Sequence, residues 1–159
     1  APEEWMQTQR RRAPNVVYLS VDLESTLAMK HMDVTRLDLP DANFDVIFCN
    51  HVLEHVVDDR SAMRELLRVL RPEGWAILQT PVDLARERTD EDVSVTDPAQ
   101  RLHRFGQRDH VRRYGRDFFD RLAECGWKVT RDRFVTTLGE SATLRYALDP
   151  GEELVLGRK

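Results

Sequence analysis

Residues 43–81 constrain the fold of this chain more than any other stretch. An apolar run, Phe44–Cys49, is followed by a polar loop, a charged amphipathic segment, a Pro/Gly turn and a second apolar run, Trp75–Gln79. Short apolar runs on either side of an amphipathic segment predict a strand–helix–strand unit. The first run is apolar almost throughout, which predicts a strand covered on both faces, as in parallel sheets. The polar loop after it then lies at the carboxyl edge of the sheet, where open α/β folds bind ligands.

The remaining elements complete one α/β domain, residues 1–159, because no repeat or internal linker divides the chain. Residues 71–74 (RPEG) predict a turn. Residues 83–97 are acidic and poor in apolar side chains, which predicts a mobile loop. Helices are expected at residues 2–12, from Asp58 or Asp59 to Leu70, at 98–105 and at 116–124, and further strands at 15–22, 30–34, 127–134 and 153–157.

The composition argues against several classes of partner. The 159 residues carry a net charge of −4, so no overall field draws the chain to nucleic acid or to an anionic membrane. Cys49 and Cys125 form neither a disulfide framework nor a Cys-x-x-Cys metal pair, and no apolar run approaches the ~20 residues that cross a bilayer. We therefore expect a cytoplasmic protein without a nucleic-acid or membrane partner. The first residue is Ala rather than Met, which indicates a processed or excised chain.

Polar side chains follow three of the predicted strands. Asp22 ends the first of them, and a carboxylate at this place can accept hydrogen bonds from the two hydroxyls of a ribose. A turn or helix-cap acid explains Asp22 equally well. Asp33 is placed to accept the amine of an adenine, although Asp is also common in turns. Asn50 and His51 end the most apolar strand, and they are either ligand-binding groups or an ordinary polar strand end.

A zinc motif competes for the same loop. His51, Glu54 and His55 match the pattern His-x-x-Glu-His, in which two imidazoles on one helix face hold zinc and the Glu activates water. The pattern requires a helix, whereas His51 directly follows a predicted strand, and no third ligand stands out downstream. We expect no metal site, and zinc hydrolysis remains a minor alternative.

Residues 104–115 are rich in side chains that occur in active sites. Phe105 and Tyr114 are candidates to frame a substrate, and His110 is a candidate general base. The alternative is a structured connection between helices whose arginines form surface ion pairs, each worth about 0–1 kcal/mol.

Several short motifs together give the chain a family resemblance. No single one is diagnostic, but their order over about 60 residues is specific. They resemble the class I S-adenosylmethionine-dependent methyltransferases of the small Rossmann-like type over roughly residues 15–135. The motifs are residues 22–25 (DLES), 32–34 (MDV), 39–47 (LPDANFDVI), 51–56 (HVLEHV) and 70–75 (LRPEGW).

The resemblance implies a seven-stranded sheet, mostly parallel with an antiparallel C-terminal strand, and S-adenosylmethionine as cofactor. It places Asp22 at the cofactor ribose, Asp33 and Val34 at the adenine, and Asn50 and His51 at the methionine end. The substrate lid is implied at about residues 83–115. The implied cofactor-binding residues are Glu3, Asp22, Leu23, Asp33, Val34, Asn50 and His51.

The chain departs from the family at its start. Such enzymes begin with a strand and a Gly-x-Gly loop, whereas all seven glycines here lie at or beyond Gly74, and Ala1-Pro2-Glu3 stands in place of the loop. The fold is thus expected to be N-terminally truncated, with the missing strand lying between those that end at Asp22 and Asn50. Each buried backbone group left unpaired costs about 1–3 kcal/mol. We therefore expect a homodimer, by strand exchange, or a rearranged sheet, with impaired cofactor binding.

The leading functional hypothesis is methyl transfer from S-adenosylmethionine to a small-molecule acceptor. The candidate catalytic residues are His51, His55 and His110. A second hypothesis is a non-catalytic module of the same fold that acts through oligomerisation or partner binding. The acceptor cannot be read from the sequence, because specificity lies in the loops after Pro81.

Overall fold

The computed structural model describes Thr8 and residues 15–159. Glu3 and, apart from Thr8, the helix predicted at residues 2–12 lie outside the described residues.

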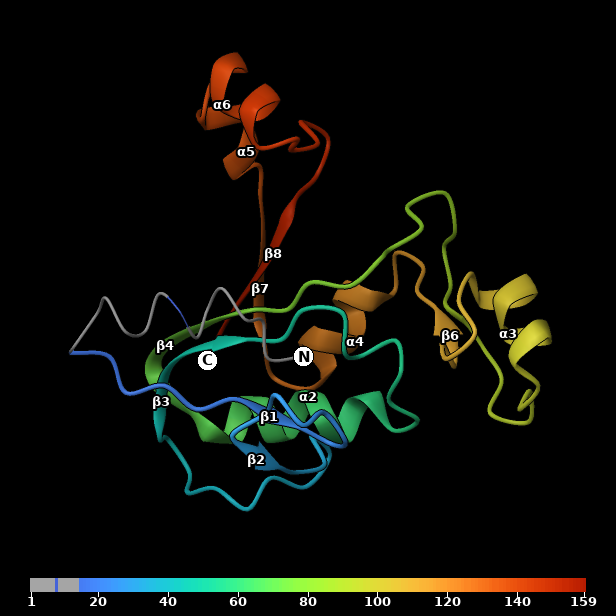
Figure 1. Ribbon diagram of the computed structural model, residues 1–159, viewed down its shortest axis with the longest axis horizontal. Helices are drawn as coiled ribbons and strands as arrows, with labels where there is room; N and C mark the ends of the chain where they lie inside the picture. Colours follow the sequence, from blue (N-terminus) through green and yellow to red (C-terminus); the bar gives the residue numbers. More distant parts are fainter. Residues whose placement is uncertain (1–7, 9–14) are drawn as a thin grey trace.

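Four strands form the main sheet, in the order β3-β4-β8-β7 (Figure 1). They are β3 (Phe44–Phe48), β4 (Leu70–Ile77), β8 (Leu154–Arg158) and β7 (Lys128–Asp132). β3 and β4 are parallel, and β8 is antiparallel to both β4 and β7, so β8 is the one reversed strand. This confirms the prediction of a mostly parallel sheet with an antiparallel C-terminal strand.

The helix α2 (Asp59–Val69) packs its apolar stripe into the core. The Asp58 carboxylate caps it by accepting a hydrogen bond from the amide of Ser61 at 2.9 Å, which satisfies one of the free amides of the first turn. The helix α4 (Phe118–Glu124) contacts α2, and the indole of Trp127, which follows α4, donates to the Met63 carbonyl at 3.0 Å. The core cluster joins the two helices to the sheet through Ala62, Met63, Leu66, Val69, Ala76, Leu78, Phe118, Leu122 and Val155.

The predicted turn at residues 71–74, between α2 and the apolar part of β4, takes the form of a bulge within β4. Leu70 ends the helix with extended backbone angles and already pairs with Phe44, whereas the next pair is Val46 with Trp75. Residues 71–74 therefore lie opposite Asp45 alone. A side chain at Gly74 would place its Cβ 2.8 Å from the Asp45 carbonyl oxygen, so this close approach requires glycine.

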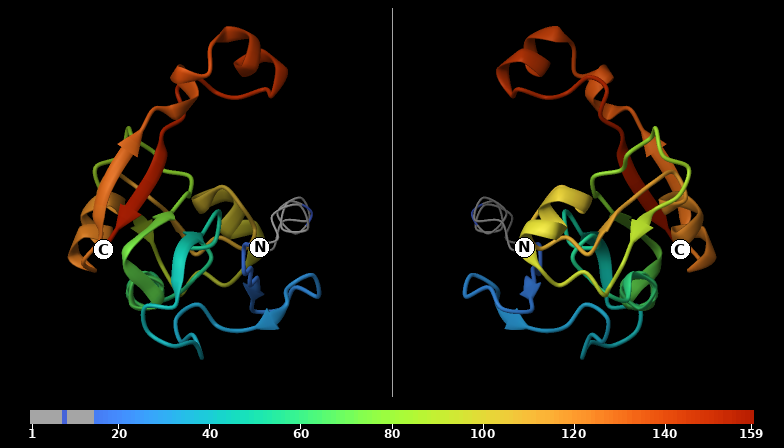
Figure 2. Two further views of the ribbon diagram at one scale, coloured as in Figure 1. Left: turned by 90° about the vertical axis from the view of Figure 1, so that its left-hand side faces the viewer. Right: turned by 90° about the vertical axis from the view of Figure 1, so that its right-hand side faces the viewer.

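A separate parallel ladder precedes the main sheet. It consists of β1 (Val21–Asp22) and β2 (Lys30–His31), and Figure 2 shows this pair apart from the four-stranded sheet. Within residues 15–159, no ladder joins β1 to β3. The described strands thus do not form the single seven-stranded sheet that the resemblance implies, and the strand predicted at 15–22 is shortened to its last two residues.

The expectation that β3 is covered on both faces is wrong. No residue of β3 belongs to the fully buried class, and Phe48 is 49% exposed. Within the described chain β3 is paired only with β4, so it is an edge strand of the four-stranded sheet rather than an inner one.

The segment from residue 83 to residue 115 is folded. β5 (Asp90–Glu91) pairs antiparallel with β6 (Arg112–Arg113), and α3 (Pro98–Phe105) has the predicted bounds. Asp97 caps α3, and Gly106 ends it in the left-handed conformation at φ 93°. The predicted mobile loop at 83–97 is instead a structured segment that contributes a strand.

Between β7 and β8 the chain leaves the sheet and returns. This excursion, the arm (residues 133–153), contains α5 (Phe134–Thr137) and α6 (Glu140–Arg145) and extends away from the rest of the molecule (Figure 1). Within the described residues, no helix combines the length and the apolar character needed to cross a membrane.

Candidate functional site

The loop that follows β3, residues 50–57, carries the polar groups predicted at the carboxyl edge. The amide of His51 donates to the Gln79 carbonyl at 2.8 Å, so the loop continues beside the end of β4. His51 has φ 52°, a left-handed conformation that His adopts more often than most residues. Such backbone strain is frequent at functional sites. Its side chain is 63% exposed.

A buried carboxylate orients His51. Glu54 is 2% exposed, its Oε1 lies 3.3 Å from His51 Nδ1, and its Oε2 accepts a hydrogen bond from the Thr80 hydroxyl at 2.7 Å. Glu54 therefore connects the loop after β3 to the chain after β4. Because Nδ1 of His51 faces this carboxylate, Nε2 is the nitrogen left for another partner.

Two further histidines lie next to Glu54. The rings of His55 and His110 make an edge contact, with centroids 4.7 Å apart and planes at 82°. His55 Nδ1 is 3.3 Å from Asp109 Oδ2, and His110 Nδ1 is 3.3 Å from the Phe105 carbonyl oxygen. His110 is buried, and its Nε2 has no hydrogen-bond partner among the described residues. The structure thus brings together the three histidines that the sequence nominated from separate segments.

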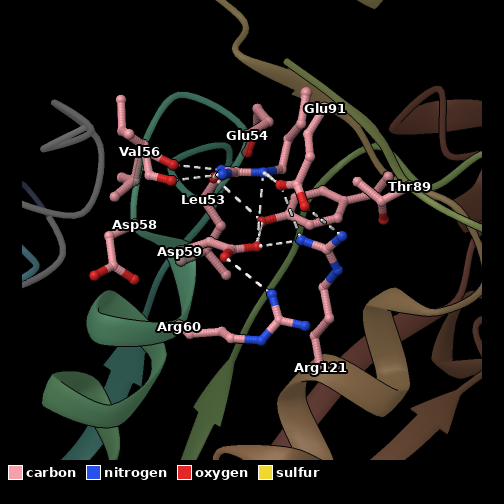
Figure 3. A network of polar contacts seen from close by, with 12 residues as sticks. Leu53, Glu54, Val56, Asp58, Asp59, Arg60, Thr89, Glu91 and Arg121 are labelled. Atoms are coloured by element: carbon pink, nitrogen blue, oxygen red, sulfur yellow. Dashed lines mark hydrogen bonds and ion pairs between the residues drawn. The ribbon is translucent and has the colours of Figure 1, made fainter. Parts of the chain in front are cut away.

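Arg112 is buried and fixes the loop in place, and Figure 3 shows the polar network around its partners Leu53, Val56 and Glu91. Arg112 donates to the carbonyl oxygens of Leu53 and Val57, each at 2.8 Å, and to that of Val56. Its Nε donates to Glu91 at 3.1 Å. Since these carbonyls belong to the loop and Glu91 to β5, Arg112 ties residues 83–115 to the end of β3.

The same network continues to the helices (Figure 3). Asp59, at the start of α2, accepts a hydrogen bond from the Tyr114 hydroxyl at 2.8 Å and pairs with Arg121 of α4 at 3.2 Å. Arg121 also pairs with Glu91 at 2.8 Å. The guanidinium groups of Arg121 and then Arg112 lower the pKa of Glu91, against the opposing effect of burial. Both arginines are buried, so their charges depend on these carboxylates.

The two residues nominated to frame a substrate are buried in the protein. Tyr114 is inaccessible and its hydroxyl is used by Asp59 and by the Leu53 carbonyl at 3.2 Å. Phe105 is buried at the end of α3, with the Arg104 guanidinium 5.2 Å from its ring centre. Neither ring is available to a substrate in this structure, and both act as supports of the segment that carries His110.

The predicted cofactor residues at β1 and β2 are held by local turns. Asp22 Oδ1 accepts hydrogen bonds from the amides of Glu24 at 3.0 Å and Ser25 at 2.8 Å, and these bonds lower the pKa of Asp22. Asp33 Oδ1 accepts from the amide and the hydroxyl of Thr35, both at 2.8 Å. Each carboxylate keeps its Oδ2 without a hydrogen-bond partner among the described residues. Leu23 is exposed, and Val34 is half-buried.

Asn50 lies just after the end of β3, at the start of the loop that carries His51. Its Oδ1 is buried and accepts no hydrogen bond within the described chain. No hydrogen bond joins Asn50 or His51 to Asp22 or Asp33 in residues 15–159. The cofactor candidates therefore remain two separate sets. One set lies at β1 and β2, the other follows β3, and no ladder joins β1 to β3 within residues 15–159.

Sequence reasoning missed the buried network. It assigned the arginines of residues 104–115 to surface ion pairs, which describes Arg113 (side chain 47% exposed) but not Arg112 (1%). No local signal separates these neighbours, because what buries Arg112 is the distant loop around Leu53. The zinc motif does not have the backbone that it requires. Residues 51–55 form bends and turns, whereas the His-x-x-Glu-His pattern needs a helix.

Comparisons with known proteins agree with this fold. The family model described as "Methyltransferase domain" matches residues 3–78. A malonyl-[acyl-carrier protein] O-methyltransferase of Halorhodospira halophila is 35% identical over 118 residues, which are 72% of this chain and 35% of that protein. A 27-O-demethylrifamycin SV methyltransferase of Amycolatopsis mediterranei is 34% identical over 68 residues, 43% of this chain and 25% of that protein. The chain thus spans about a third or less of these relatives.

Solved structures share the fold at low sequence identity. An S-adenosylmethionine-dependent methyltransferase from Archaeoglobus fulgidus superposes with a TM-score of 0.60 at 10% identity, covering 97% of this chain and 80% of that one. Another, from Mesorhizobium loti, gives 0.51 at 17% identity, covering 99% and 77%. The matched family model and the curated relatives support membership of the class I S-adenosylmethionine-dependent methyltransferases, and the solved structures show the fold of that class.

Proposed function

We propose that this chain transfers a methyl group from S-adenosylmethionine to a small-molecule acceptor. The observation that carries the proposal is the His51–Glu54 pair at the carboxyl edge: an exposed imidazole whose inner nitrogen lies 3.3 Å from a buried carboxylate. This is the arrangement of a general base with an orienting group. An acceptor hydroxyl or amine that attacks a methyl carbon must lose a proton, and His51 Nε2 is placed to take it.

The residues present fit the cofactor in two respects. Asn50 Oδ1 is a buried acceptor without a donor among the described residues, which suits the amino group of a methionine moiety. Asp22 keeps one carboxylate oxygen for ribose hydroxyls, and we assign Leu23, Asp33 and Val34 to the adenine. When bound, the cofactor supplies an electrophilic methyl group, and the protein's task is mainly to position the acceptor against it.

The roles of the three histidines differ. The His51 side chain is 63% exposed at the strand end and serves as the proton acceptor, whereas His55 is about one-third exposed and His110 is buried. We therefore assign proton transfer to His51 and leave His55 and His110 as supporting groups of the acceptor side. We also propose a cytoplasmic location, because both cysteines are free.

Calorimetry with S-adenosylmethionine and S-adenosylhomocysteine tests the cofactor assignment on the full chain. We expect binding that is lost in Asp22→Ala and kept in Glu24→Ala, a neighbouring exposed carboxylate. Unchanged affinity in Asp22→Ala contradicts the ribose role. For His51, transfer of a labelled methyl group to a panel of hydroxyl and amine acceptors should fall strongly in His51→Gln and persist in His103→Gln.

A second candidate function is a non-catalytic module of the same fold. It is favoured by the absence of a ladder between β1 and β3 within residues 15–159, since the family's cofactor lies beside the strand between them. In that case two copies exchange strands to form a homodimer. No binding at millimolar cofactor, together with a dimer in sedimentation equilibrium, supports the module. Cofactor binding by a monomer supports the enzyme.

A further inference from the structure

We propose that Glu54, His55 and His110 form a binding site for a divalent metal ion of the zinc class. One ligand atom from each of these residues lies within 4.8 Å of the others. The site goes beyond methyl transfer, since it is defined by protein side chains alone and needs neither cofactor nor acceptor. It also differs from the His-x-x-Glu-His pattern, because the group does not include His51 and takes its third ligand from a distant segment.

The backbone that carries the three residues is already fixed. The amide of Val111, next to His110, donates to the Glu54 carbonyl at 3.0 Å, which joins the two segments directly beneath the site. Arg112 then binds three carbonyls of the same loop. Little reorganisation is therefore needed to present the ligands, which is what a tight metal site requires.

The hydrogen bonds of the two imidazoles favour the tautomers that bind metals. His110 Nδ1 faces the Phe105 carbonyl oxygen, which can only accept, so this nitrogen carries the proton and Nε2 keeps its lone pair. His55 Nδ1 faces the Asp109 carboxylate, which assigns the same tautomer. Metal-binding histidines almost always donate their other N–H to a carbonyl or a carboxylate. Both of these partners are present here.

One of the lone pairs is buried without a partner. His110 is 4% exposed, and its Nε2 makes no hydrogen bond within the described residues. Buried polar atoms without a hydrogen-bond partner are uncommon in folded proteins, and a bound water or ion is one explanation for them. Glu54 retains acceptor capacity, because a carboxylate offers about four lone-pair positions and His51 and Thr80 use two of them. A cation beside His110 Nε2 satisfies both groups.

The ligand set selects the kind of metal. Two imidazoles and one carboxylate are the protein ligands of several catalytic zinc centres, which leave a fourth position open for water or substrate. Mg²⁺ and Ca²⁺ prefer oxygen ligands throughout. His55 is about one-third exposed, so the ion enters from its side while Glu54 and His110 remain covered. An ion bound to His110 Nε2 also excludes that atom as a base, which agrees with the assignment of proton transfer to His51.

Metal titration of the full 159-residue chain, stripped of metals with a chelator and dialysed, tests the site. We expect one Zn²⁺ per chain by calorimetry, and the intense visible absorption of four-coordinate Co²⁺ when cobalt replaces zinc. His110→Gln and His55→Gln should abolish binding. His103→Gln and His31→Gln, which change exposed histidines outside the site, should leave it unchanged.

Asp109→Asn distinguishes a metal site from a merely structural cluster, because Asp109 is exposed and its loss leaves the core intact. Zn²⁺ affinity should fall by about 10–100-fold, with no change in the melting temperature of the metal-free protein. The proposal is overturned if the unmodified chain binds no Zn²⁺, if His110→Gln binds it as well as the parent, or if Asp109→Asn leaves the affinity unaltered. Where His110→Gln does not fold, the Asp109→Asn result decides.

Discussion

The loop at residues 50–57 and the β1–β2 pair both carry predicted functional residues, but they are held in different ways. The loop is fixed from a distance: Arg112, fifty-odd positions later in the chain, binds three of its carbonyls and is itself paired with Glu91. The β1–β2 pair is held by a two-residue ladder, and the partners of Asp22 lie within its own turn. The loop is therefore held by tertiary structure, and the β1–β2 pair by local structure.

This difference has an energetic consequence. A buried ion-pair network is rigid but costly to disturb, because removing one partner leaves the other charge desolvated. A turn held by its own amides forms with little loss of free energy, and its disruption destabilises only the turn. We expect substitutions around the loop to reduce the stability of the whole domain, and substitutions at β1 to act on ligand binding alone.

The largest effect is expected from Arg112→Met. The change removes the donors to three loop carbonyls and leaves Asp59 and Glu91 without one of their cations, so the free energy of unfolding should fall by about 3–5 kcal/mol. Urea denaturation measures it. Arg113→Met is the matched control, because that guanidinium is half exposed and, among the described residues, pairs with Asp83 alone. It should change stability by less than about 1 kcal/mol. Equal effects would show that the network does not fix the loop.

Tyr114→Phe should have the next largest effect. The hydroxyl donates to the Asp59 carboxylate at 2.8 Å in a fully buried position, and hydrogen bonds to charged groups contribute about 1.5–3 kcal/mol. Thermal or urea unfolding should show a loss of this size. Tyr146→Phe, on the exposed surface of the arm, should be neutral. If Tyr114→Phe leaves the free energy of unfolding unchanged, a water molecule has taken the place of the hydroxyl, and water reaches the buried network.

Acid should remove more stability from the loop than from ordinary surface pairs. Because Arg121 and Arg112 lower the pKa of Glu91, the native state binds this proton less readily than the unfolded state. The stabilisation is therefore complete above the ordinary pKa of 4.5 and is lost as the pH falls through the lower native value. Glu91→Gln should flatten this acid limb in a series of unfolding curves, whereas Glu87→Gln, at an exposed pair, should not.

The smallest effect on stability is expected at Val17, which precedes β1 in the chain. Val17 is 98% exposed, so Val17→Thr should change the free energy of unfolding by no more than about 0.5 kcal/mol. A loss above about 1 kcal/mol would break the comparison, because it would mean that another strand covers Val17 in solution. The same variant run in sedimentation equilibrium then tells whether that cover comes from a second copy.

The predictions made from sequence were accurate where local signals decide the structure. The α3 helix begins at Pro98 and ends at Phe105 as predicted, since Asp97, Pro98 and Gly106 mark both ends. The helix capped by Asp58 and the strands β3, β7 and β8 were also predicted within a few residues. In these elements the cap residues and the apolar period carry the information.

The remaining features depend on partners far away in the chain. The strand predicted from Asn15 keeps only Val21 and Asp22, because β-branched residues form a strand only where a neighbour pairs with them. The convergence of His110 with Glu54 and His55 follows from the Val111–Glu54 hydrogen bond and the buried Arg112, neither of which has a local signature. The sequence singled out these histidines one by one, but their arrangement could not be foreseen because it depends on these distant contacts.

The arm shows a different kind of independence. β7 and β8 pair along their whole length, and the last pair, Asp132 with Leu154, sits at the base of the arm. The chain therefore leaves the sheet and re-enters it at adjacent points, so the arm is topologically a hairpin loop that has grown into a small structure. We expect that a shorter peptide can replace residues 134–151 without altering the sheet order, provided that Glu152 and Glu153, which accept hydrogen bonds from Gln79, are kept. Gln79 joins the base of the arm to the loop that carries His51, so a reporter or an affinity tag belongs at the far end of the arm, near α5 and α6 (Figure 1).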